Sequence, residues 1–163
     1  MKPLRVQAGF TYLAMLFAIA LSGVVLAEVG INWILERQRD KESQLLFVGN
    51  QFRQAIALYY ERTPGAIKRY PPKLEDLLTD ERYNTPQHYL RKLYNDPITN
   101  RAQWGLVIAP DGGIMGVHSL SDDQPIKTAE FDYPNRSFEK AESYSKWRFI
   151  YSPQSLIQQQ ATR

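Results

Sequence analysis

The chain of 163 residues contains no cysteine, which excludes disulfide bonds, thiolate metal ligands and a cysteine nucleophile. Histidine is nearly absent as well, and no spacing joins His88 and His118 into a metal site or an acid–base pair. The motifs G-x-S-x-G and H-E-x-x-H do not occur. Pro110–Gly113 is typical of a hairpin turn rather than a phosphate loop, because no Lys-Ser/Thr pair or helix follows it. We therefore expect a protein that is not an enzyme.

A strong excess of charge of either sign is also lacking. Lys and Arg number 20 against 17 Asp and Glu, and two of the basic residues, Lys2 and Arg5, lie in the first nine. Without those nine residues the balance is 18 to 17, which is nearly neutral. No basic stripe is interleaved with aromatic residues, so we expect no nucleic-acid partner. The length predicts one domain beyond a membrane segment.

What the sequence does contain is a long apolar run near its N-terminus. Phe10–Ala27 carries no charge, and Phe10–Val29 would span about 30 Å as a helix, the thickness of a membrane's hydrocarbon core. A basic leader ends at Gly9, directly before the run. A secretory signal peptide is cut after its apolar stretch, whereas cutting at Gly9 would leave the apolar helix on the product. This order predicts a permanent anchor that also serves in assembly.

The leader and the residues that follow it resemble the prepilin motif of type IV pilin-like proteins, and among them the pseudopilins of type II secretion systems. Gly9, Phe10, Thr11 and Leu13 match the motif in order, with Tyr12 in a usually aliphatic position. The resemblance implies cleavage after Gly9 by a prepilin peptidase, followed by N-methylation of Phe10.

Ala14 departs from this motif, because the family has a glutamate there. In the family that carboxylate is thought to pair with the N-terminal amine of the neighbouring subunit in the filament. A charge in lipid is costly unless it is paired, and Ala14 offers no such partner. Loss of this acid is a feature of tip-type minor pseudopilins, so Ala14 favours a minor or divergent subunit. Assembly is still expected to run through this part of the helix, with Thr11, Leu13 and Ala14 in it.

The resemblance also implies a location and a set of partners. It implies a single-pass protein of the bacterial inner membrane whose C-terminal head lies in the periplasm. The implied partners are other pseudopilins or pilin-like subunits, the prepilin peptidase, the inner-membrane assembly platform and membrane lipid. The orientation comes from the resemblance, because basic residues flank the apolar run on both sides. The sequence does not indicate which secretion or pilus system the protein serves.

Two other interpretations remain open. Val25-Leu26-Ala27 before Glu28 matches a signal-peptidase site, which would make the product a secreted soluble domain. Alternatively, the protein is a membrane-anchored periplasmic scaffold or binding domain that does not polymerise, an interpretation that Ala14 supports.

The helical pattern continues beyond the apolar run to Arg62 without a proline. Spacings of three and four residues predict one apolar stripe on an amphipathic helix. Its members are Ile31, Ile34, Leu35, Leu45, Val48, Phe52, Ile56 and Tyr59. Between the two halves of the stripe, charged residues predict a solvated segment: Glu36, Arg37, Arg39, Asp40, Lys41 and Glu42. Thr63-Pro64-Gly65 then predicts the end of the helix.

The remainder of the chain predicts a small antiparallel sheet. Trp104–Ala109 and Ile114–Ser119 flank the Pro110–Gly113 turn, and Trp147–Tyr151 alternates as a third strand. A short helix is expected at Lys73–Leu78. The fold class is therefore α+β, in which a long N-terminal helix packs on a small sheet, as the pilin-like resemblance also implies.

These patterns divide the chain into five parts. They are a leader (1–9), a transmembrane half of the helix (10–29), an amphipathic half (30–62), an α+β head (63–153) and a polar, flexible tail (154–163).

Two features of the head resemble parts of major-type pseudopilins. Asp96-Pro97 followed by Asn100 is similar to the stretch that leads into their sheet, although Asp before Pro is also a general turn signal. The loop after the second strand holds Asp122 and Asp123, where those proteins bind calcium. Ca²⁺ prefers six to eight oxygen ligands, and the glycines of the family loop are absent here. Asp122 and Asp123 are the candidate calcium ligands, and the alternative is a solvated acidic loop.

Overall fold

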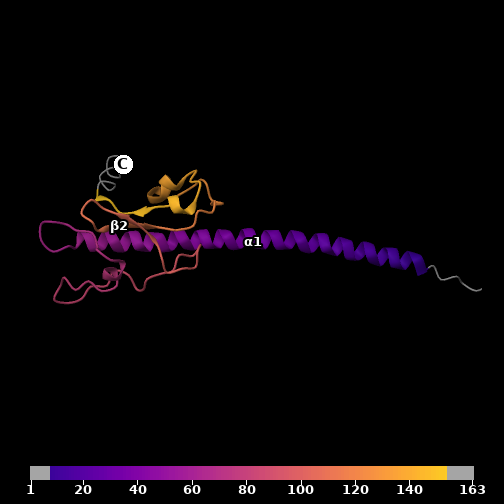
Figure 1. Cartoon of the computed structure of the whole chain (residues 1–163), viewed down its shortest axis with the longest axis horizontal. Helices are drawn as coiled ribbons and strands as arrows, with labels where there is room; N and C mark the ends of the chain where they lie inside the picture. The colour runs from indigo at the N-terminus through magenta and orange to yellow at the C-terminus, as the bar shows by residue number, and fades with distance from the viewer. Residues whose placement is uncertain (1–7, 154–163) are drawn as a thin grey trace, which may run out of the picture. The chain divides into compact units, whose positions relative to one another are not determined.

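The computed structural model describes residues 8–153, except the side chains of residues 8, 9 and 24–32 (Figure 1). Residues 1–7 of the predicted leader and the predicted tail, 154–163, lie outside the described residues. The chain divides into two compact units, one up to Gln38 and one from Arg39 onward. Residues 39–153, which include the predicted head (63–153) and the part of α1 that packs against it, are called the head. One long helix and a three-stranded antiparallel sheet confirm the predicted α+β class.

The helix α1 runs from Ala8 to Glu61, within two residues of the predicted bounds. Its end has a local cause. The Thr63 hydroxyl donates to the Tyr59 carbonyl oxygen at 3.0 Å, and the Thr63 N–H donates to the Tyr60 carbonyl oxygen at 3.1 Å. The Lys68 ammonium donates to the Glu61 carbonyl oxygen at 2.6 Å. These bonds satisfy carbonyl groups that the last helical turn leaves without intrahelical partners.

In the first unit, the side chains from Phe10 to Gly23 are uncharged and exposed all around the helix. The Ser22 hydroxyl is satisfied within the helix, because it donates to the Ala18 carbonyl oxygen at 2.7 Å. Among the residues that the structure describes, no helical stretch is both long and apolar enough to cross a membrane. The predicted span Phe10–Val29 includes residues whose side chains are not described, 24–29, so the span stays a prediction.

In the head, α1 forms one wall of the hydrophobic core. Its buried residues contact a cluster of aromatic side chains from the rest of the head. Gly49 lies at a close approach between α1 and Phe149, since a Cβ at this position would lie 2.4 Å from the ring of Phe149. The helix contributes Leu45, Val48, Phe52, Ala55, Ile56 and Tyr59, and the other elements contribute Trp104, Phe131, Phe138, Tyr144, Trp147 and Phe149.

The predicted stripe is confirmed from Leu45 to Tyr59 and wrong before it, because Ile34 and Leu35 are exposed. The side chain of Ile31 lies outside the described residues. The predicted solvated segment is wrong at Glu42, which is 3% exposed. The charge of Glu42 is compensated by hydrogen bonds from a distant loop, and a local sequence pattern does not reveal such partners.

The sheet has the order β1–β2–β3 with antiparallel pairs. β1 is Gly105–Ile108 and β2 is Ile114–His118, each slightly shorter than predicted. The turn between them depends on Gly112, whose φ of 85° lies in the left-handed region. The Gly113 N–H donates to a carboxylate oxygen of Asp111 at 3.1 Å. The predicted hairpin is therefore confirmed.

The third strand, β3, contains only Phe149–Ile150, whereas the sequence predicts Trp147–Tyr151. The difference arises because a short 3₁₀ helix, η3 (Tyr144–Lys146), precedes it, and the Trp147 N–H donates to the Tyr144 carbonyl oxygen at 3.0 Å. The predicted alternation still holds, since Trp147, Phe149 and Tyr151 are buried and Arg148 is exposed.

Two further 3₁₀ helices complete the head. The predicted helix at Lys73–Leu78 is a single 3₁₀ turn, η1 (Leu74–Leu77), which buries Leu77 in the core. The second, η2 (Tyr133–Phe138), starts with a proline in its first turn and buries Phe138.

Candidate functional site

The residues of the predicted processing motif lie in the first turns of α1. The side chains of Phe10, Thr11, Leu13 and Ala14 are exposed there. Cleavage after Gly9 and methylation of Phe10 are covalent steps that stay predictions.

The predicted calcium ligands lie in the loop after β2, and serine hydroxyls hold both of them. The Ser145 hydroxyl donates to the Asp122 carboxylate at 2.9 Å, and the Ser121 hydroxyl donates to the Asp123 carboxylate at 2.8 Å. Both aspartates are exposed. Within residues 8–153, no group of three or more His, Cys, Asp and Glu is arranged to hold a metal ion. Calcium at Asp122 and Asp123 stays a prediction.

Asp96 connects its own turn to the start of this loop. Its buried carboxylate accepts the Ile98 N–H at 2.9 Å, the Thr99 hydroxyl at 2.9 Å and the Ser119 hydroxyl at 2.7 Å. Asn100, which the sequence singled out with Asp96, adopts a φ of 57°, a conformation that asparagine tolerates well. The Asp96–Asn100 stretch is thus an ordered turn that supports the end of β2.

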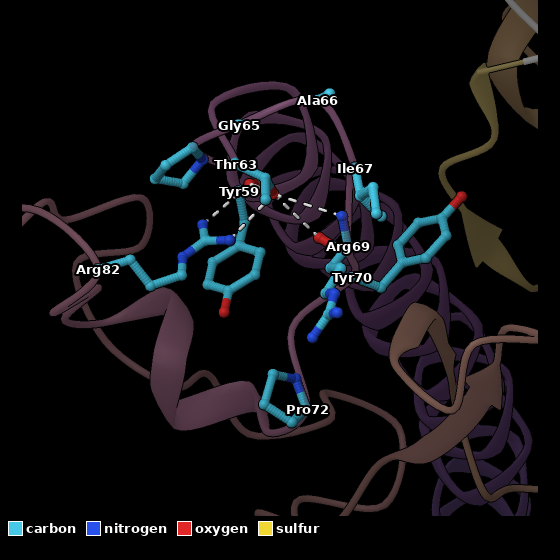
Figure 2. Close-up of a pocket in the computed structure, with 10 residues that line it drawn as sticks. Tyr59, Thr63, Gly65, Ala66, Ile67, Arg69, Tyr70, Pro72 and Arg82 are labelled. Atoms are coloured by element: carbon cyan, nitrogen blue, oxygen red, sulfur yellow. Dashed lines mark hydrogen bonds between the residues drawn. The ribbon is translucent and has the colours of Figure 1, made fainter.

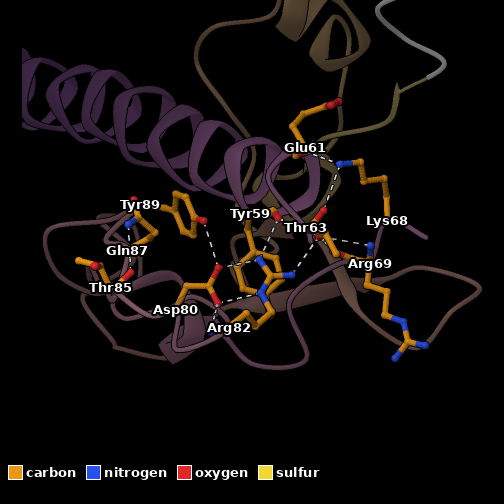
Figure 3. Close-up of polar contacts among 10 residues, drawn as sticks. All are labelled: Tyr59, Glu61, Thr63, Lys68, Arg69, Asp80, Arg82, Thr85, Gln87 and Tyr89. Carbon is orange, nitrogen blue, oxygen red and sulfur yellow. Dashed lines mark hydrogen bonds and ion pairs between the residues drawn. The ribbon is translucent and has the colours of Figure 1, made fainter. Parts of the chain in front are cut away.

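The C-terminal end of α1 carries a dense polar network around Arg82 (Figure 3). The guanidinium forms a bidentate ion pair with Asp80, with both N···O distances at 2.7 Å. It also donates to the Tyr59 carbonyl oxygen at 3.0 Å and to the Thr63 hydroxyl at 2.9 Å. Its central carbon lies 3.5 Å from the centre of the Tyr59 ring. Arg82 therefore acts as a cationic cap on the helix end.

Asp80 is the buried partner of this cap and is itself fully engaged. The Tyr89 hydroxyl donates to its carboxylate at 3.0 Å, in addition to the bonds from Arg82. Burial alone would raise the pKa of Asp80, but the hydrogen bonds from Arg82 and Tyr89 outweigh it and lower the pKa. For Arg82, burial alone would lower the pKa, and the bonds to Asp80 raise it. The network therefore keeps both groups charged and is suited to fixing structure.

Beside the cap lies an open pocket of about 830 Å³ (Figure 2). Tyr59, Thr63 and Arg82 form one side of it, and Ile67 is a strongly exposed apolar residue of its lining. Burial raises the pKa of Tyr70, on the same lining, to about 12, so its hydroxyl stays protonated at neutral pH. The guanidinium of Arg82 and the hydroxyl of Thr63 are paired with one another at 2.9 Å, and Arg69 is a second basic residue of the lining.

A second groove, of about 820 Å³, lies between the last turns of α1, η2 and β3. Its apolar lining includes Leu58 and Ile150, and two guanidinium groups, those of Arg53 and Arg136, line it as well. We call this the arginine groove. The carboxylate of Glu61, also in the lining, accepts a hydrogen bond from the Tyr151 hydroxyl. The full lining is Asn50, Arg53, Gln54, Ala57, Leu58, Glu61, Tyr133, Pro134, Arg136, Ser137, Ile150 and Tyr151.

The two histidines have separate backbone partners. The Nδ1 atom of His88 contacts the Leu78 carbonyl oxygen, and that of His118 lies 2.8 Å from the Ser119 carbonyl oxygen. A carbonyl only accepts hydrogen bonds, so we assign a proton to Nδ1 in both rings. Each imidazole thereby fixes a local backbone segment.

Sequence reasoning missed the Arg82 cap and the arginine groove. The Asp80-x-Arg82 spacing is a usable signal for a local ion pair, but the helix carbonyl that it caps comes from 23 residues earlier in the chain. Arg53 follows the buried Phe52, and nothing local distinguishes it from a surface arginine. No family model, curated protein or solved structure matches the chain.

Proposed function

We propose that the chain is a pseudopilin-like subunit of a short fibre, in a type II secretion system or a type IV pilus-like system. In this proposal the prepilin peptidase cuts after Gly9, Phe10 becomes the methylated N-terminus, and the subunit joins the fibre through its N-terminal helix. The head projects into the periplasm and contacts neighbouring subunits. In this proposal, the long helix and the small sheet form a pilin-like fold.

One observation carries this proposal. The helix α1 begins with an uncharged stretch, Phe10–Gly23, that is exposed on every side, and it later becomes the amphipathic wall of the head core. A helix that is apolar all around needs a membrane or neighbouring helices to cover it. The same element therefore suits both anchoring and packing in a helical bundle. The departure at Ala14 favours a minor position in the fibre, such as its tip.

The test is to follow the full chain in cells with and without the prepilin peptidase. We expect a peptidase-dependent decrease in mass, a product that resists alkaline extraction from membranes, and crosslinks from the α1 N-terminal stretch to other pilin-like subunits. A Gly9→Val chain is the matched control, and it should stay at full length. Release of the head by alkaline wash would contradict the proposal in favour of a secreted domain. A membrane-bound chain without such crosslinks would favour the scaffold that does not polymerise.

A further inference from the structure

The Arg53 guanidinium in the arginine groove has a donor atom without a hydrogen-bond partner among the described residues. The Arg53 guanidinium donates to the Asn50 side-chain oxygen at 2.9 Å, and its central carbon lies 5.5 Å from the centre of the Phe149 ring. Its Nε atom is buried without a hydrogen-bond partner among the described residues. A buried donor without an acceptor is unfavourable. Burial lowers the pKa of Arg53 to about 10, so the group remains charged at neutral pH.

The rest of the groove lining adds a second guanidinium, that of Arg136, one carboxylate, that of Glu61, and several apolar side chains. Arg136 is exposed and lies over the Tyr133 ring at 5.4 Å. Neither Arg53 nor Arg136 has an ion pair with a residue that the structure describes. Within the same lining, Leu58 is 41% exposed and Tyr133 is 47% exposed. The fitting occupant therefore carries a carboxylate within a few residues of an aliphatic side chain.

The chain itself exposes such a segment, the loop 119–123. Leu120 is 51% exposed, and the carboxylates of Asp122 and Asp123 follow it directly on the surface. Each carboxylate receives one serine hydroxyl bond, which leaves acceptor capacity for a guanidinium. The residues 154–163, which follow the groove residue Tyr151 in sequence, include no Asp or Glu side chain.

This loop is held away from the groove of its own copy. The Ser145 N–H donates to the Ser121 carbonyl oxygen at 2.9 Å, and the Ile126 N–H donates to the Glu42 carboxylate at 2.6 Å. Glu42 precedes the first groove residue on α1, Asn50, by 8 positions, which corresponds to about 12 Å along the helix axis. A contact between loop and groove therefore joins two copies through different surfaces.

We propose that the arginine groove receives the 119–123 loop of a second copy of this chain, with Leu120 next to Leu58 and with Asp122 and Asp123 next to Arg53 and Arg136. Such a contact is heterologous and does not close a dimer, so it requires a fibre that contains at least two copies of this chain, which a position at the tip alone does not provide. The inference deepens the proposed function and rests on it in one respect, that the repeated contact lies in a fibre.

Because the chain has no cysteine, disulfide trapping gives a direct test in membranes that contain the full chain. Two tagged forms are co-expressed, one with Leu58→Cys or Tyr133→Cys and the other with Leu120→Cys, and mild oxidant is added. We expect a disulfide between the two forms for at least one groove position. The matched control pairs Leu120→Cys with Ile67→Cys, an exposed position outside the groove lining, which should not crosslink above background.

A charge exchange tests the electrostatic part. Arg136→Glu lies on the surface and should lower the crosslinking rate about threefold to fivefold, and Asp122→Lys on the second form should restore it. Equal crosslinking at Ile67→Cys, or none at either groove position in chains with native circular dichroism, overturns the proposal. The proposal is also overturned if a disulfide forms within one copy, between Leu58→Cys and Leu156→Cys, instead of between two copies. The residues 154–163 are then the occupant of the groove.

The same membranes separate this inference from the proposed function. Mass analysis of the trapped chains reports the N-terminus independently of the crosslink. A disulfide between uncut chains would leave the groove contact standing while the processing proposal fails. Methylated Phe10 without any disulfide would leave the processing standing while the groove proposal fails.

Discussion

Replacing Glu42 by alanine tests what holds the loop after β2 on α1. The Glu42 carboxylate accepts the Ile126 N–H at 2.6 Å, the Lys127 N–H at 3.2 Å and the Tyr144 hydroxyl at 2.9 Å. Alanine leaves these three donors without their acceptor, and each such loss costs about 1–3 kcal/mol. Ile126 and Lys127 are half-buried and can gain water, whereas Tyr144 is fully buried. We expect the free energy of unfolding to fall by about 3–4 kcal/mol.

The assay is urea unfolding of the full chain in detergent, followed by near-ultraviolet circular dichroism of the aromatic core. With a slope of about 2 kcal/mol per molar urea, the midpoint should fall by about 1.5–2 M. The matched control is Asp40→Ala, an exposed acid two positions earlier on the same helix, which should change stability by less than about 0.5 kcal/mol. Equal midpoints for the two variants would refute the argument that buried hydrogen bonds to Glu42 hold the loop.

Further predictions concern the helix cap and the close contact between Gly49 and Phe149. Arg82→Ala should destabilise the head by about 3 kcal/mol in urea unfolding, because it leaves Asp80 buried without its cation. The pKa of Asp80 is lower in the folded state, so its contribution is complete above the ordinary value of about 3.9 and is lost as the pH falls through the lowered value. Acid titration should therefore show a loss of stability below about pH 4 that Asp80→Asn reduces, and identical profiles would contradict this assignment. Gly49→Ala should lower the free energy of unfolding by about 1 kcal/mol, because overpacking against Phe149 exceeds the gain in helix propensity, and a stabilised variant would contradict the close approach.

The sequence predicts the fold well where the signals are local. The helix ends near Arg62 because Thr63-Pro64-Gly65 breaks the pattern, and the hairpin forms because Asp111 and Gly112 suit its turn. The same kind of reasoning fails at β3, where η3 takes the Trp147 N–H before the ladder begins. The alternation of apolar and polar residues predicts a strand, but it does not show that a 3₁₀ helix and the strand compete for the same N–H donor.

The candidate sites are harder to predict because their partners lie far apart in the chain. Glu42 meets residues more than 80 positions later, and Arg82 caps a helix end 23 positions earlier. A charge pattern along one segment cannot identify such partners, so it predicts a solvated Glu42. Arg53 belongs to a groove that forms only when η2 and β3 lie beside α1.

The central claim is that Gly9–Phe10 is a processing site and that the apolar helix stays on the product. Intact-mass measurement with N-terminal fragmentation of the membrane-extracted chain tests it most directly, in cells with and without the prepilin peptidase. The account predicts a peptidase-dependent product that begins at N-methylated Phe10. A product that begins at Glu28, or a chain that retains Met1 in the presence of the peptidase, would contradict it.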